Sequence, residues 1–312
     1  MTLTARVSSR RSLAGLLCGL AALAAANFAA AQTIEEIPLR KLDPAAPPAP
    51  PEEIEFHAGG LDDRGFNRVV RRVAVPTLTV YHSAQPAHRR AALVAIAGGG
   101  YQGIVIDREG HAFGRYFQAR GLTVAVLKYR LPQPETFAAG LPAPQQDALE
   151  AVRTLRRHAA EWNIDPRRIG VIGASAGGHI AGSAALLGRS ADDSRPDFAV
   201  LLYPVVTMEP PFAHAGSRAA LLGPHPAAER VREFSLEQNA RAGLPPFFLA
   251  HARDDKTVPV ENTEQLAVAL RAAGVPVEAM IVATGGHGFA LGRGRESSEW
   301  KDRFLAWLDR LP

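Results

Sequence analysis

Cysteine is nearly missing from this sequence of 312 residues, with Cys18 as its single example. Cys18 lies in an N-terminal segment that we expect to be removed, so the mature chain should form no disulfide and use no cysteine nucleophile. The sequence also lacks a His, Asp and Glu cluster with the spacing of zinc ligands. We therefore expect neither a metal nor any other cofactor.

Acidic residues are absent from the first 31 positions, which instead hold three arginines and then an uncharged stretch over residues 13–31. The stretch ends in three alanines, which offer a small-residue cleavage site. This arrangement predicts a signal peptide over residues 1–31 and hence a periplasmic or secreted protein. An uncleaved membrane anchor is the alternative, but the stretch is marginal for it in length and hydrophobicity.

Two export routes fit this segment. Residues 9–13 (SRRSL) resemble the twin-arginine signal, although paired arginines also occur in ordinary signals.

Removal of the segment takes away three arginines and no acid, which lowers the formal net charge from +4 to +1. A nearly neutral mature chain gives no reason to expect nucleic acid or, after signal cleavage, a membrane as partner.

Proline is concentrated in residues 43–51 (DPAAPPAPP), which should be extended. We therefore predict a proline-rich linker over residues 32–53 and one domain over residues 54–312. In that domain predicted strands and helices alternate, which indicates an α/β fold with a mostly parallel central sheet and helices on both faces. Residues 207–243, rich in Pro, Ala and Gly, interrupt the alternation, and we expect them to form a short cap-like insertion.

A G-x-S-x-G motif occupies residues 173–177, between a predicted strand over 169–173 and a predicted helix over 176–187. In that context the glycines permit a tight strand-to-helix turn that exposes the serine hydroxyl. The motif predicts Ser175 as a nucleophile and the N–H of Ala176 as a donor to the oxyanion. The alternative is a tight turn with an incidental serine.

A serine nucleophile needs a base that is oriented by an acid, here expected in the chain order Ser, acid, His. Asp255 follows a predicted strand ending at residue 251, and His287 follows the last predicted strand, residues 277–282. We choose Asp255 over Asp254 because its D-x-x-V-P spacing is frequent in such enzymes. Asp254 should face solvent or brace the loop.

Three glycines follow a predicted central strand: Gly98, Gly99 and Gly100. Their backbone N–H groups can approach a substrate carbonyl, and we expect them to complete an oxyanion hole with Ala176. A dinucleotide site is the competing interpretation, but the G-x-G-x-x-G spacing is lacking. Tyr101, which follows the three glycines, and Ala174, which precedes Ser175, are expected to contact substrate. His179 should be a packed core residue, and His214 and His225 either line the cleft or face solvent.

Several motifs occur together in one order along residues 68–310. They resemble those of the acetyl-xylan-esterase-like branch of the α/β-hydrolases, a relative of the hormone-sensitive-lipase group. The departure is Ala97, where the lipase group has His and the esterase-like branch more often Pro. The motifs are Gly98–Tyr101, Glu109-Gly110, Lys128–Pro132, Gly173–His179, Tyr203–Val205, Leu221–Gly223, Asp255–Asn262 and Gly286–Phe289.

The resemblance implies an α/β-hydrolase fold and a serine carboxylesterase. We expect hydrolysis of short-chain or acetyl esters, such as acetylated xylan oligosaccharides, through a Ser-His-Asp triad and an acyl-enzyme. One alternative is a serine peptidase of the prolyl-oligopeptidase type, although no propeller precedes the domain. Another is a catalytically inactive hydrolase fold that binds a ligand. The partner is thus a small-molecule or oligosaccharide ester, and the oligomeric state stays open.

Overall fold

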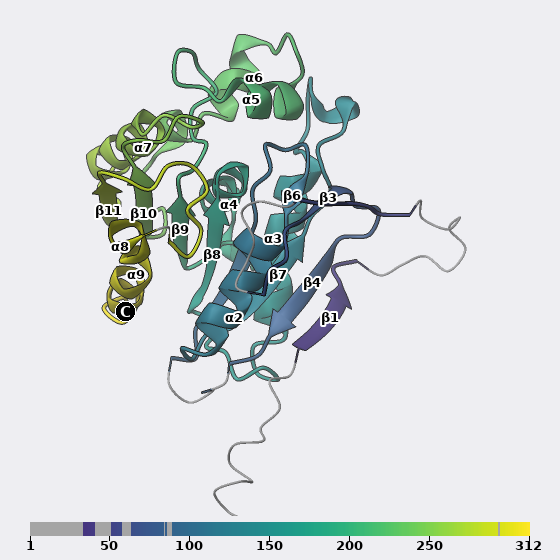
Figure 1. Cartoon of the computed structure of the whole chain (residues 1–312), viewed down its shortest axis with the longest axis vertical. Helices are drawn as coiled ribbons and strands as arrows, with labels where there is room; N and C mark the ends of the chain where they lie inside the picture. The colour runs from purple at the N-terminus through teal and green to yellow at the C-terminus, as the bar shows by residue number, and fades with distance from the viewer. Residues whose placement is uncertain (1–33, 41–50, 58–63, 84, 86–88, 293) are drawn as a thin grey trace, which may run out of the picture. The chain divides into compact units, whose positions relative to one another are not determined.

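The computed structural model describes residues 34–40, 51–57, 64–83, 85, 89–292 and 294–312. An eight-stranded sheet runs through this part of the chain (Figure 1), and six of its strands are parallel. The strands, in spatial order, are β1 (Ile34–Pro38), β4 (Thr77–Tyr81), β7 (Thr123–Lys128), β5 (Ala92–Ile96), β8 (Ile169–Ala174), β9 (Phe198–Leu202), β10 (Phe247–Ala252) and β11 (Val277–Val282).

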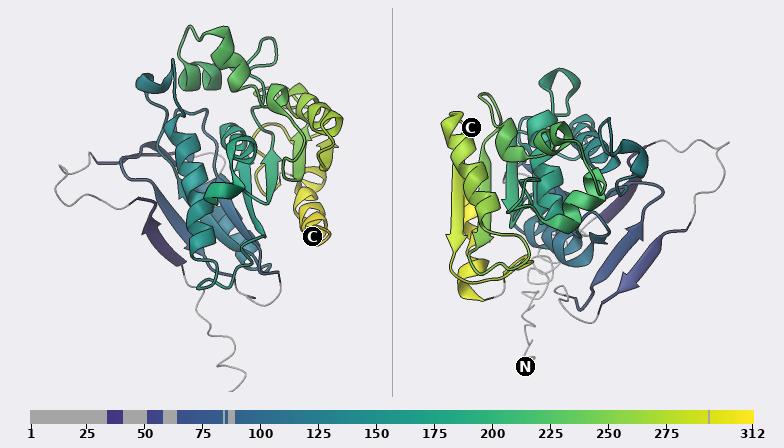
Figure 2. Two further views of the ribbon diagram at one scale, coloured as in Figure 1. Left: turned by 180° about the vertical axis from the view of Figure 1, so that it is seen from behind. Right: turned by 90° about the horizontal axis from the view of Figure 1, so that it is seen from above.

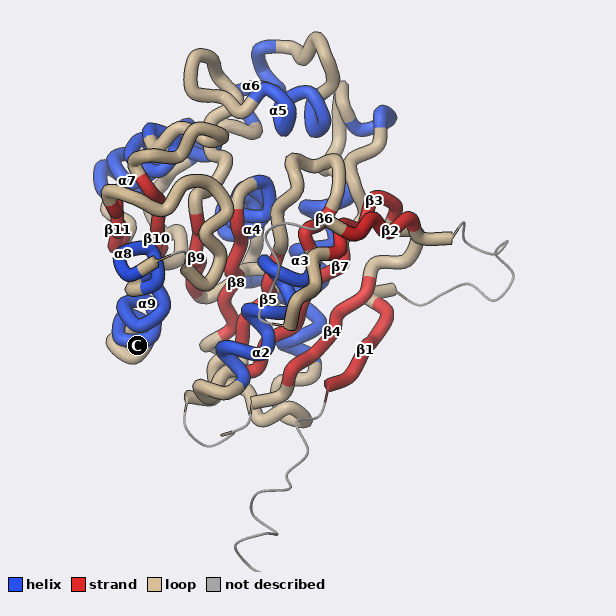
Figure 3. The backbone as a smooth tube through the Cα atoms, viewed as in Figure 1, coloured by secondary structure: helices blue, strands red, loops and turns tan. Residues whose placement is uncertain are grey.

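A smaller antiparallel sheet and the helices complete the described elements (Figure 3). The small sheet contains β2 (Glu53–Phe56), β3 (Arg68–Arg72) and β6 (Ile104–Val105). The α-helices are α2 (Ala112–Gln118), α3 (Ala143–Arg157), α4 (Ala176–Leu187), α5 (Ala215–Leu222), α6 (Ala228–Glu233), α7 (Glu261–Ala272), α8 (Arg295–Ser298) and α9 (Trp300–Leu308). A π-helical turn, η1 (Asp107–His111), precedes α2, and 3-10 turns are η2 (Pro134–Thr136), η3 (Ser190–Asp192) and η4 (Leu236–Asn239).

The helices cover both faces of the large sheet, as the alternation predicts. Phe198 and Phe248 point to one face, where their rings contact Phe304 of α9. Phe304 also packs edge-on against Phe117 of α2 at 5.4 Å between ring centroids. A Cβ on Gly173 would point to the opposite face, where it would meet Gly177 and Ala181 of α4. The central strand β5 is buried at all five positions, which explains its continuous apolar sequence.

The expected linker is partly wrong. Ile34–Pro38 lies inside the predicted linker, yet it forms β1, which pairs antiparallel with β4 at the edge of the large sheet. The domain therefore begins at Ile34 and not at Ile54. Strand β1 is largely exposed and its sequence, IEEIP, is polar, so backbone pairing rather than an apolar face holds it. The predicted signal peptide and most of the proline-rich stretch lie outside the described residues.

The predicted insertion carries α5, α6 and η4 between β9 and β10. Figure 1 shows α5 and α6 beyond the end of the sheet, and the two views in Figure 2 agree with this placement. Strands β5, β8, β9, β10 and β11 are parallel, so the loops that follow them leave the same, carboxyl edge. That edge is where ligand sites form in open α/β sheets.

Two buried histidines make the stability of the fold depend on pH. His111 contacts the Tyr81 hydroxyl at 2.9 Å, and His179 contacts the Tyr101 hydroxyl at 2.6 Å. Burial lowers the pKa of each imidazole from 6.5 to about 4. The unfolded chain therefore binds protons between these values that the folded chain does not bind, and stability falls as the pH drops.

We expect the free energy of unfolding to decrease between pH 6.5 and pH 4, by up to about 3 kcal/mol for each histidine. Urea unfolding at several pH values measures this decrease. In His111→Gln or His179→Gln the dependence should become shallower, because one titrating group is gone. A parent protein whose stability is constant over this pH range would contradict the burial argument.

Candidate active site

Ser175 occupies a strained turn at the carboxyl end of β8. Its φ and ψ are 54° and −123°, between a strand that ends at Ala174 and a helix that begins at Ala176. Side chains cannot replace the two flanking glycines, since a Cβ on either Gly173 or Gly177 would lie 2.1 Å from a backbone oxygen. The tight approach of α4 to the sheet thus fixes the serine in a conformation that costs energy by itself.

The three predicted side chains of the triad meet at this edge. His287 Nε2 lies 2.9 Å from Ser175 Oγ, and His287 Nδ1 lies 2.7 Å from Asp255 Oδ2. Asp255 has a fully buried side chain, whereas 21% of the His287 side chain is exposed. With Nδ1–H donated to the carboxylate, Nε2 is free to accept the serine proton. The arrangement can move a proton off a hydroxyl.

Asp255 stays ionised despite its burial. Its Oδ1 accepts from the backbone N–H groups of Thr257 and Val258 at 2.8 and 2.9 Å. Burial alone would raise the pKa of Asp255, but hydrogen bonds from His251 and His287 outweigh it and hold the pKa far below its ordinary value. Neighbouring Asp254 accepts from the N–H of Gly286 at 2.8 Å and so braces the loop of His287, as expected.

The glycine loop differs in one detail from the prediction. Gly98 cannot serve as an oxyanion donor here, because its N–H donates to the Glu109 carboxylate at 2.9 Å. The N–H groups of Gly99, Gly100 and Ala176 have no hydrogen-bond partner among the described residues. Gly99 and Gly100 have φ values of 135° and 64°, a region that favours glycine. These three amides are thus the available donors.

Tyr101 and Ala174, both expected to contact substrate, are buried. Tyr101 is 2% exposed, and its hydroxyl contacts His179 at 2.6 Å and accepts from Gln145 at 3.0 Å. Its hydroxyl therefore anchors the glycine loop in the core. Ala174 is the last residue of β8 and is fully buried, like the rest of that strand. His179 is a core residue, as expected, and also contacts the Phe234 carbonyl oxygen at 2.7 Å.

Sequence reasoning assigned no role to three residues that support the site. His251, fully buried in β10, lies 3.1 Å from Asp255 Oδ2. The Tyr203 ring packs edge-on against His287 at 5.1 Å, and its hydroxyl donates to Glu109 at 3.0 Å. Glu109 and Tyr203 are part of the motifs that carry the family resemblance, which was the available signal.

His214, from the insertion, lies near the site. Its Nδ1 accepts from the N–H of Ser217, so the ring proton is on Nε2, which has no partner among the described residues. Burial lowers the pKa of His214, and the charge of His287 lowers it further. A Cβ on Gly216 would lie 3.3 Å from His214 Cε1 and 3.6 Å from Gln102 Nε2, so these two polar side chains are neighbours.

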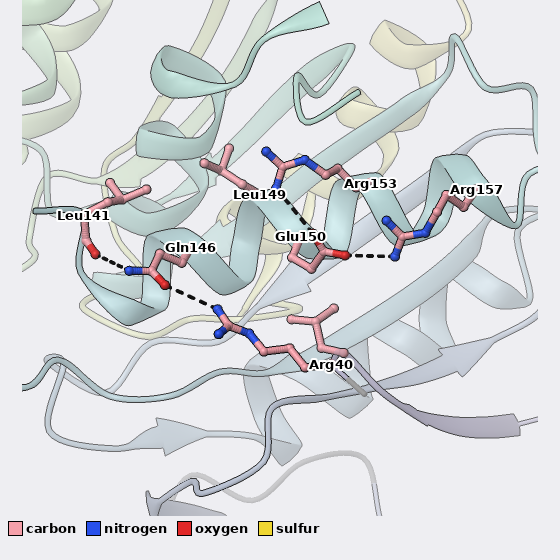
Figure 4. A pocket seen from close by; sticks show the side chains of 8 residues that line it. Arg40, Leu141, Gln146, Leu149, Glu150, Arg153 and Arg157 are labelled. Atoms are coloured by element: carbon pink, nitrogen blue, oxygen red, sulfur yellow. Dashed lines mark hydrogen bonds and ion pairs between the residues drawn. The ribbon is translucent and has the colours of Figure 1, made fainter. Parts of the chain in front are cut away.

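A pocket of about 740 Å³ lies elsewhere, beside α3 (Figure 4). Its charged groups are paired, since Glu150 contacts Arg153 and Arg157 at 3.4 and 2.8 Å. None of its lining residues belongs to the triad. Over the described residues no group of His, Cys, Asp and Glu could hold a metal, and no helix has the length and apolar character to cross a membrane.

Comparison with known proteins identifies the class. A family model described as the alpha/beta hydrolase fold matches residues 93–291, which is more than half of the chain. The chain therefore belongs to the alpha/beta-hydrolase family, and the fold predicted from the motifs is confirmed.

Several known proteins show which members of the family this chain is similar to. An acetylxylan esterase from Xylanibacter ruminicola is 33% identical over 229 residues, 71% of this chain and 46% of its own. Endo-1,4-beta-xylanase B from Butyrivibrio fibrisolvens is 33% identical over 260 residues, 80% of this chain and 40% of its own. The chain thus spans less than half the length of these relatives. An acetyl ester-xyloside bifunctional hydrolase from Caldicellulosiruptor lactoaceticus superposes with a TM-score of 0.72 at 31% identity, over 88% of this chain and 95% of that one.

Proposed function

We propose that the protein is a carboxylic ester hydrolase that works through a Ser-His-Asp triad. The observation that carries this proposal is the continuous row of hydrogen bonds from Ser175 through His287 to Asp255. Beside that row, free backbone amides at Gly99 and Ala176 support binding of an oxyanion. The named esterases among the relatives support the same reaction class.

The first half of the reaction forms an acyl-enzyme. Ser175 Oγ attacks the ester carbonyl carbon while its proton passes to His287 Nε2. The Asp255 carboxylate stabilises the resulting imidazolium, and the free amides of the glycine loop and of Ala176 bind the negative oxygen. His287 then returns the proton to the alcohol oxygen as the carbon–oxygen bond breaks, and the alcohol leaves.

The second half regenerates the serine. Water attacks the acyl carbonyl and gives a proton to His287, and the same amides bind the second oxyanion. Collapse of that intermediate breaks the bond to Ser175 Oγ, which recovers the proton from His287. The products are a carboxylic acid and an alcohol, and the enzyme returns to its starting state.

For the substrate we propose acetyl or other short acyl esters of sugars, such as acetylated xylan oligosaccharides. The acetylxylan esterase and the acetyl ester-xyloside hydrolase among the similar proteins support both the acetyl group and the sugar. The unpartnered Nε2–H of His214, which lies close enough to His287 and Asp255 to be affected by their charges, supports an alcohol that offers a hydroxyl. Export through residues 1–31, which would bring the enzyme to such polymers in the periplasm or outside the cell, stays a prediction.

Ser175→Ala should lower kcat for nitrophenyl acetate by at least ~10³-fold, because the nucleophile is gone. Ser183→Ala, in the helix α4 that follows Ser175, is a matched control, since the buried Ser183 hydroxyl has no hydrogen-bond partner among the described residues. It should keep wild-type kinetics.

The same assay, repeated with dipeptidyl amides as substrates, separates the rival hypotheses. Hydrolysis of dipeptidyl amides without hydrolysis of esters would favour the peptidase, and no turnover of either would favour the inactive binding protein. Equal ester turnover by wild type and Ser175→Ala would refute the triad.

His214→Ala should raise KM for acetylated xylo-oligosaccharides by ~10-fold while leaving nitrophenyl acetate hydrolysis near wild type, because one hydrogen bond to a hydroxyl is lost. His225→Ala, an exposed histidine of the same insertion, is the control and should change neither substrate. Steady-state kinetics on both substrates measure this. A uniform change, or none, would show that His214 does not read the alcohol.

A further inference from the structure

Glu109 is a buried carboxylate that the proposed reaction does not use. It belongs to η1, and 3% of its side chain is exposed. Its nearest cation is Arg108, whose Nη2 lies 3.7 Å from Glu109 Oε1. Burying a carboxylate is costly unless it accepts hydrogen bonds, so the partners of Glu109 indicate what it does.

One oxygen of Glu109 holds the glycine loop. Oε2 accepts the N–H of Gly98 at 2.9 Å, at the residue where the loop leaves β5. Gly98 has no room for a side chain, because a Cβ there would lie 2.8 Å from Ser175 Cβ and 2.9 Å from Glu109 Oε2. Fixing the Gly98 peptide sets the direction in which the following amides of Gly99 and Gly100 point.

The other oxygen holds the loop of His287. Oε1 accepts the Tyr203 hydroxyl proton at 3.0 Å, and the same hydroxyl accepts the N–H of Ala290 at 3.1 Å. The Tyr203 ring also contacts His287, and Tyr203 has a positive φ of 36°, a conformation that requires support from its surroundings. Burial raises the pKa of Tyr203 well above its ordinary value, and the charge of Glu109 raises it further, so the phenol remains a donor.

We propose that Glu109 is a positioning residue that sets the oxyanion donors and His287 relative to each other. This inference rests on the proposed esterase function. Gly98 begins the loop that supplies the oxyanion donors, and the Tyr203 ring contacts the imidazole of His287. The Glu109 carboxylate binds both Gly98 and Tyr203. Because reacting groups displaced by about 1 Å can lose ~10²-fold in rate, such a brace acts on turnover without touching substrate.

The test uses three variants of the full chain. Glu109→Gln keeps the shape, but its amide nitrogen cannot accept a second hydrogen bond, so one of the two loops is released. Tyr203→Phe releases only the His287 loop and covers the case in which Glu109→Gln fails to fold. Asp147→Asn is the control, because Asp147 is a fully buried carboxylate that pairs with Arg130.

We expect Glu109→Gln to lower kcat for nitrophenyl acetate by ~10–100-fold while KM changes less than ~3-fold. Tyr203→Phe should lower kcat by a smaller factor, and the double variant should be no slower than Glu109→Gln, because both act through one brace. Asp147→Asn should lower the Tm and leave kcat unchanged.

Three results would overturn the proposal. If Glu109→Gln lowers the Tm but keeps the kcat of the wild type, the carboxylate has a purely structural role. Multiplying effects in the double variant show that the two loops are held independently. A wild-type protein that cleaves no ester removes the proposed function and this inference together, whereas wild-type turnover with either of the first two results removes only the inference.

Discussion

The hydrogen bond between the Asp255 carboxylate and His287 Nδ1 is the interaction on which the rest of the site depends. It selects the imidazole tautomer whose Nε2 faces Ser175, at 2.9 Å from the hydroxyl. The carboxylate can do this only because backbone amides and His251 compensate its burial. A neutral acid at this position could donate as well as accept, so it would no longer fix the imidazole tautomer.

The fold brings the groups of this site together at one edge of one sheet. The loops after β5, β8, β9, β10 and β11 carry the glycine loop, Ser175, Tyr203, Asp255 and His287 in turn. Strain is concentrated there, since Ser175 and Tyr203 both have positive φ, and rigid buried strands hold it. The buried sheet thus converts residues far apart in sequence into neighbours.

Much of this was predictable because local sequence dictated it. The glycines of residues 173–177 have no alternative in the turn around Ser175, and the chain order of acid and histidine follows from a parallel sheet. What failed depended on partners distant in the chain. The N–H of Gly98 is taken by Glu109, the hydroxyl of Tyr101 by His179, and no pattern in the glycine loop reveals either. The polar strand β1 was missed because its pairing with β4 is a backbone property.

The most direct test of the central claim asks whether Ser175 is the activated nucleophile. The protein is treated with a fluorophosphonate probe and digested, and the peptides are mapped by mass spectrometry. We expect one adduct, on Ser175, in wild type, and none at the same exposure when His287 is replaced by alanine. An adduct on a different residue, or equal labelling without the imidazole, would contradict it.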